Sequence, residues 1–76
     1  MYYNDKKYKQ SIKYFEKAIE IEPKNAIAYN NICSAYNRLQ KWDEAIKACE
    51  KAISLDVNFQ LAKNNLNYSK SMKGEE

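Results

Sequence analysis

The sequence predicts an all-α fold made of antiparallel helix pairs, and three observations predict it. The chain repeats itself at an offset of 34 residues, because the segment KYFEKAI that starts at Lys13 returns as KACEKAI from Lys47. Apolar side chains recur at spacings of three and four residues, the spacing of one helix face. The 76 residues include one Gly and one Pro, so few helix breakers interrupt these stripes.

The self-match divides the chain into three parts. A complete copy of the repeat spans residues 26–59, with a partial copy at 1–25 and a third segment at 60–76. The expected helices lie near residues 9–22, 26–39, 43–55 and 60–72. Links of a few residues make successive helices antiparallel neighbours. We therefore expect a single module of about four helices: a truncated first repeat, one full repeat, and a C-terminal capping helix with a tail.

Each helix of the complete copy carries its own apolar stripe. The first stripe consists of Tyr29, Ile32, Cys33 and Tyr36, and the second of Ala45, Ile46, Cys49, Ala52 and Ile53. Asp43 stands where its carboxylate could accept backbone N–H bonds as the N-cap of the second helix. Pro23 disfavours helical geometry in the residue before it, so the first helix of the chain should stop near Glu22.

This pattern resembles the tetratricopeptide repeat, a 34-residue helix-turn-helix with the pattern W-x2-L-G-x2-Y, A-x3-F and Pro. The matching positions are Tyr29, Ile32, Cys33, Tyr36, Ala45 and Cys49, in that order. Val57 replaces the closing proline. Lys63, Asn67 and Lys70 occupy places where a following helix would pack, which is typical of the polar capping helix that ends such arrays. The resemblance implies a helical solenoid fragment that acts as a protein-interaction scaffold.

A second face of the first helix lies opposite its apolar stripe. The resemblance implies that this face, together with the equivalent face of residues 60–72, lines a concave groove that binds a peptide. The candidate peptide-binding residues are Ile27, Asn30, Asn31, Ser34, Asn37, Arg38, Leu61, Asn65 and Tyr68. The alternative is a polar surface that happens to repeat.

Two precedents within the family bear on the ligand of this groove. Asn31 and Asn65 are similar to the asparagine ladder of O-linked N-acetylglucosamine transferases, whose amides hold peptide backbones. The chaperone-binding clamp for a C-terminal carboxylate needs paired basic residues, whereas Leu61 and Asn65 stand in their places. Ile27 and Leu61 could instead contact peptide side chains. An alternative function is an assembly or targeting domain appended to a larger enzyme, such as a glycosyltransferase.

The composition offers little for catalysis, so we expect no enzymatic activity and no cofactor. The chain has no His, and its only Gly, Gly74, lies in the tail, so no phosphate-binding loop is present. Two Cys without His cannot complete a tetrahedral zinc site, and no metal is expected. Cys33 and Cys49 are expected to be reduced and buried as small hydrophobic residues.

The charge pattern favours a protein partner over nucleic acid or a membrane. Thirteen basic and ten acidic residues leave a net charge of +3, without a basic stripe that could neutralise several phosphates. No apolar run approaches the roughly 20 residues that span a bilayer, so we expect no direct membrane insertion. We expect a cytoplasmic location instead. Ile12, Phe15 and Ile19 lack a preceding partner helix. We expect this exposed face of residues 9–22 to self-associate, or to be covered by an upstream helix.

Overall fold

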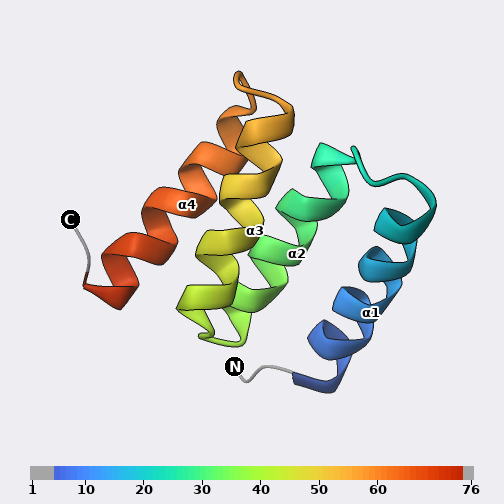
Figure 1. Cartoon of the computed structure of the whole chain (residues 1–76). Helices are drawn as coiled ribbons and strands as arrows, with labels where there is room; N and C mark the ends of the chain where they lie inside the picture. The colour runs from blue at the N-terminus through green and yellow to red at the C-terminus, as the bar shows by residue number, and fades with distance from the viewer. Residues whose placement is uncertain (1–4, 75–76) are drawn as a thin grey trace.

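The computed structural model describes residues 5–74 and contains four α-helices in that range (Figure 1). They are α1 (Asp5–Ile21), α2 (Ala26–Arg38), α3 (Trp42–Leu55) and α4 (Gln60–Lys73). Each helix runs antiparallel to the one before it, and the described range holds no strand. The predicted all-α class and its helix-turn-helix architecture are confirmed.

The helices stack so that α2 and α3 lie in the middle, with α1 and α4 at the two ends (Figure 1). The backbone of α2 neighbours α1, α3 and also α4. The Cα atoms extend over 33 × 30 × 17 Å. A thickness of 17 Å accommodates about two layers of helices, since one helix with its side chains is about 10–12 Å across. α2 and α4, which contact each other, lie in the same layer and form one face of the stack, which we call the α2–α4 face.

The helix ends follow from local residues, and only the start of α1 differs from the prediction by more than one residue. α1 starts at Asp5, four residues earlier than expected, and ends at Ile21, just before the Glu22–Pro23 step. Asp43 is not the N-cap of α3, because that helix begins one residue earlier with Lys41 at the cap position. Asp43 lies in the first turn, where its negative charge complements the helix dipole.

A side-chain cap and a backbone cap define the two ends of α2. The Asn25 Oδ1 atom accepts a hydrogen bond of 3.0 Å from the Ala28 N–H, which makes Asn25 the N-cap of α2. At the far end of α2, Gln40 adopts a left-handed conformation with φ of 62°. The Gln40 and Lys41 N–H groups then donate to the carbonyls of Asn37 and Tyr36, which is the Schellman arrangement of a helix C-terminus. This turn sets the direction in which α3 starts.

The core lies mainly between α2 and α3. Its buried centre consists of Ile32, Cys33, Ala45, Ala48 and Cys49, and Phe15, Ile19, Tyr36 and Leu66 pack around it. Burial raises the pKa of the Tyr36 phenol above its ordinary value of 10.0, and the charges of Glu16 and Glu44 add to this increase. A phenol with a raised pKa keeps its proton at pH values where an exposed tyrosine would lose it.

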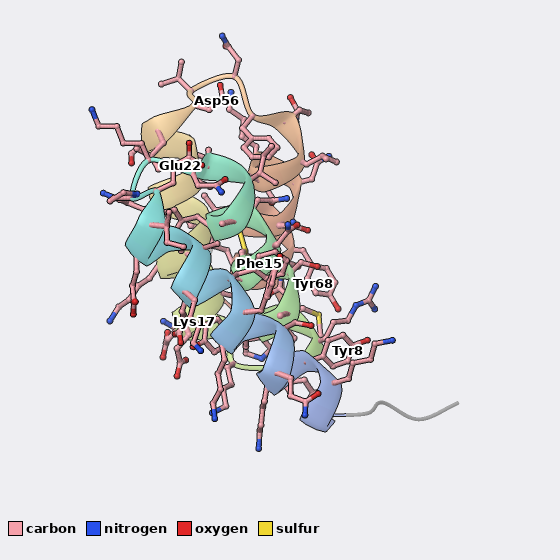
Figure 2. All side chains as sticks on the ribbon, turned by 90° about the vertical axis from the view of Figure 1, so that its right-hand side faces the viewer. Tyr8, Phe15, Lys17, Glu22, Asp56 and Tyr68 are labelled. Carbon is pink, nitrogen blue, oxygen red and sulfur yellow. A yellow bond between two sulfur atoms is a disulfide. The ribbon has the colours of Figure 1, made fainter. Side chains whose placement is uncertain are left out.

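Cys33 and Cys49 are joined by a disulfide between α2 and α3 (Figure 2). Both residues have no exposed surface, so the predicted burial is confirmed, but the predicted reduced state is wrong. The two stripes face each other across the pair of helices, and this brings the two Cα atoms within 5.4 Å. That separation lies within the range that a disulfide can bridge.

The apolar stripe of α1 faces the rest of the molecule. Ile12 is only 5% exposed, so the expectation that it lacks a cover is wrong. Phe15 and Ile19 are half-buried, and Phe15 points toward the interior (Figure 2). Tyr14 and Ile21 are the exposed apolar side chains of α1, because they project from its opposite side.

Candidate functional site

A cavity of about 280 Å³ opens where the C-terminal halves of α2 and α4 meet the start of α3. We call it the α2–α4 pocket. Its lining residues are Ser34, Asn37, Arg38, Gln40, Trp42, Asn65, Tyr68 and Met72. Five of these are among the nine candidate residues predicted from the sequence: Ser34, Asn37, Arg38, Asn65 and Tyr68. The structure therefore brings together more than half of the predicted set.

Side chains from α2 and α4 form a hydrogen-bonded network beneath the pocket. The Asn65 Nδ2 atom donates to Asn30 Oδ1 at 2.9 Å, and Asn37 Nδ2 donates to the Asn65 carbonyl at 3.4 Å. The Ser69 hydroxyl donates to Asn37 Oδ1 at 2.6 Å. Asn30, Asn37 and Ser69 are buried. These bonds hold α2 against α4, so the Asn37 amide and the Oδ1 atom of Asn30 are occupied before any ligand arrives.

The predicted pair of Asn31 and Asn65 does not form two equal rungs. Asn65 uses an amide hydrogen to bond Asn30, whereas the half-buried Asn31 side chain makes no hydrogen bond to any residue in the range 5–74. Ser34, one turn further along α2, is also half-buried and reaches the pocket. Asn31 and Ser34 therefore keep their side-chain polar groups available to a ligand, as does the exposed Arg38 one turn further along α2.

The opposite end of this face is apolar. Ile27 and Leu61 are 65% and 63% exposed, and each is the second residue of its helix. Because α2 and α4 run in the same direction side by side, both residues lie near the N-terminal ends of these helices, at the same edge of the α2–α4 face (Figure 1). The α2–α4 pocket lies near the C-terminal ends of the same two helices. The α2–α4 face thus has the exposed Ile27 and Leu61 at one edge and the α2–α4 pocket at the other.

Aromatic and sulfur-containing side chains form one wall of the pocket. The rings of Trp42 and Tyr68 meet edge to face with centroids 6.0 Å apart. Tyr68 and Met72 are each 51% exposed and lie on one face of α4 at a four-residue spacing. Tyr68 projects from the side of the stack that faces away from Lys17 (Figure 2). Arg38 is exposed and, among the residues that the structure describes, is the only charged one that lines the cavity.

Three lining residues were missing from the predicted set: Gln40, Trp42 and Met72. Met72 continues the spacing of Leu61, Asn65 and Tyr68, and that periodicity was a usable signal. Trp42 carried no such signal, because it reaches the pocket through the left-handed turn at Gln40. An ion pair between Asp43 and Lys73 joins the start of α3 to the end of α4 beside this wall.

A second cavity, of about 330 Å³, lies between α1, α2 and α3. Its lining residues are Glu16, Ile19, Tyr29, Ile32, Lys47 and Ala48.

Within residues 5–74 there is no cluster of three or more His, Cys, Asp or Glu that could hold a metal ion. No helix in the same range is long and apolar enough to cross a membrane.

Comparison with known families matches residues 26–59 and residues 1–25 to two descriptions of the tetratricopeptide repeat. The two matches together cover residues 1–59, and the chain belongs to the tetratricopeptide repeat family. Tetratricopeptide repeats mediate protein–protein interactions and are typically non-catalytic. The chain shows no match to curated proteins.

Proposed function

We propose that this chain is a non-catalytic scaffold that binds a peptide segment of a partner protein along the α2–α4 face. The observation that carries the proposal is the gathering of exposed apolar and unbonded polar side chains on this one face, ending in the α2–α4 pocket. Ile27, Leu61, Tyr68 and Met72 leave more than half of their surfaces in water there. Large apolar side chains in such a patch are typical of an interaction site.

The arrangement supports a division of roles along the face. Ile27 and Leu61 would contact apolar side chains of the peptide at one end. Asn31 offers a donor pair and an acceptor to the peptide backbone, and Ser34 offers a hydroxyl. The network of Asn30, Asn37, Asn65 and Ser69 keeps α2 and α4 at a set spacing. A groove that is formed before binding loses little conformational entropy when the ligand arrives.

The test uses peptides selected from a random peptide library for binding to the full chain. Their affinities are then measured for Ile27→Ser, for Leu61→Ser and for the control Val57→Ser, which removes an equally exposed apolar side chain outside the groove. Each groove variant should weaken binding about fivefold, as expected when a half-buried contact worth roughly 1 kcal/mol is lost. Val57→Ser should have no effect. Equal affinities for all three variants and the parent would refute the groove proposal.

A second proposal is an assembly or targeting domain within a larger enzyme, for which α1 would supply a contact surface. The supporting observation is the exposure of Tyr14 and Ile21, at 69% and 86%, away from the groove. Replacing both by Ser in the intact protein should then reduce assembly while leaving peptide binding unchanged. Intact assembly in that double variant would count against this role.

A further inference from the structure

We propose that the α2–α4 pocket recognises an acidic side chain of the peptide together with a large apolar side chain two residues away. This inference rests on the proposed peptide-binding function and names the class of ligand for its pocket. The two halves of the recognition come from separate groups of residues. Arg38 supplies the charge, and Trp42, Tyr68 and Met72 supply the apolar wall.

Within residues 5–74, the pocket carries a positive charge that no acidic side chain balances. Arg38 is the only charged lining residue in that range, and its side chain forms no ion pair or hydrogen bond with any other residue of it. Asp43, the acid next to Trp42 in the sequence, is paired with Lys73 and so does not balance Arg38. A guanidinium presents parallel N–H donors that match the two oxygens of a carboxylate. The pocket therefore favours an Asp or Glu over a Lys or Arg.

The apolar wall favours a large side chain beside that carboxylate. Tyr68 and Met72 are half-exposed in the free protein, and Trp42 meets Tyr68 edge to face. An aromatic or branched apolar ligand side chain would remove this surface from water. Asn37 and Ser69, which lie beneath the pocket, already form a hydrogen bond with each other, so they do not require one from the ligand.

The size of the pocket limits what can enter. Its volume of about 280 Å³ falls just below the range of roughly 300–1,000 Å³ for small-molecule and cofactor sites, and it suits one or two side chains. In an extended peptide, residues i and i+2 project to the same side. An acidic side chain and a large apolar side chain that share one pocket are therefore expected at this spacing.

The probe is the blocked peptide acetyl-Gly-Phe-Gly-Glu-Gly-amide, titrated into the isotope-labelled full chain and followed by amide NMR shifts. Two matched peptides replace Glu by Gln or Phe by Ala. We expect shifts at Arg38, Trp42 and Tyr68. Affinity should fall roughly two- to fivefold with Gln, as for an exposed ion pair, and about tenfold with Ala.

Variants of the protein assign the charge effect to one residue. Arg38→Gln should remove the preference for Glu over Gln. Lys51→Gln should keep it, because Lys51 is an exposed cation on α3 that does not line the pocket. Loss of the preference in both variants would overturn the assignment to Arg38, since a general charge effect would then explain it.

The remaining outcomes separate this inference from the proposed function. If all three peptides shift the α2–α4 face equally, the pocket inference is overturned and groove binding stands. If none of them shifts that face at millimolar concentration, the pocket inference is overturned, whereas groove binding is refuted only when the library-selected peptides bind Ile27→Ser and Leu61→Ser as tightly as they bind the parent. A Gln peptide with a free C-terminal carboxylate is the last arm. Tighter binding of that peptide than of the blocked Glu peptide would place the carboxylate at a chain end and overturn the side-chain assignment.

Discussion

Replacing Asn65 by Ala should destabilise the fold, because the amide of Asn65 joins α4 to α2. The substitution removes the 2.9 Å bond from Asn65 Nδ2 and leaves the Oδ1 atom of Asn30 without that donor. Asn30 is only 7% exposed, so water replaces the lost bond poorly. An unsatisfied buried polar group costs roughly 1–3 kcal/mol. The backbone carbonyl of Asn65 is retained, so the bonds it accepts from Asn37 and Ser69 can persist.

The substitution also changes helix propensity, and a control on the same helix accounts for that. Ala is favoured over Asn in a helix by roughly 0.5 kcal/mol, which offsets part of the cost. Asn67→Ala makes the same change at an exposed position of α4 that has no side-chain hydrogen bond within residues 5–74. The difference between the two variants isolates the Asn30–Asn65 bond.

Thermal unfolding followed by circular dichroism gives the measurement. Each kcal/mol should lower the melting temperature by about 4–8 °C in a domain of this size. We therefore expect Asn65→Ala to melt at least 4 °C below Asn67→Ala, by the same relation. Asn31→Ala removes a half-buried amide that makes no side-chain hydrogen bond within residues 5–74, and it should behave like the control. Equal melting temperatures for the Asn65 and Asn67 variants would show that the Asn30–Asn65 bond contributes nothing to stability.

Three further predictions follow from the core and from α1. Reducing the bond between Cys33 and Cys49, which are 16 residues apart, should lower the free energy of unfolding by about 3 kcal/mol in the loop-entropy description, and a double Cys→Ala variant should not respond to reductant. The raised pKa of Tyr36 means that its contribution to stability is complete below pH 10 and is lost as the pH rises through the folded-state pKa. Urea midpoints measured across this range should therefore fall less steeply for Tyr36→Phe than for the parent. We also propose that residues 9–22 mediate self-association through the side of α1 that carries Tyr14 and Ile21, opposite its buried stripe. Light scattering should then show a concentration-dependent mass that Tyr14→Ser with Ile21→Ser reduces, and a parent that stays monomeric at high concentration contradicts this.

Local patterns in the sequence were sufficient for the fold. The 34-residue self-match and the apolar stripes predicted four helices, and three of the four observed helices lie within one residue of the predicted bounds. These features can be read along the chain because helix periodicity and the effect of Pro23 act over a few residues. The start of α1 and the cap of α3 were misplaced, since helix ends depend on single turns of backbone.

The residue pairs that contact each other across two helices could not be predicted from spacing along the chain. The sequence placed Asn31 and Asn65 on equivalent faces, but the pairing of Asn65 with Asn30 depends on how closely α4 approaches α2. The position of Trp42 against Tyr68 likewise depends on the left-handed turn at Gln40.

The disulfide shows the same limit within the core. The apolar stripes identified Cys33 and Cys49 as buried, whereas their bond depends on a Cα separation of 5.4 Å that only the packed helices define. The sequence by itself thus determined which elements form and which faces they bury. The tertiary structure decided which buried and groove-lining atoms meet, because contacts between residues 16–35 positions apart depend on helix packing in three dimensions and not on spacing along the chain.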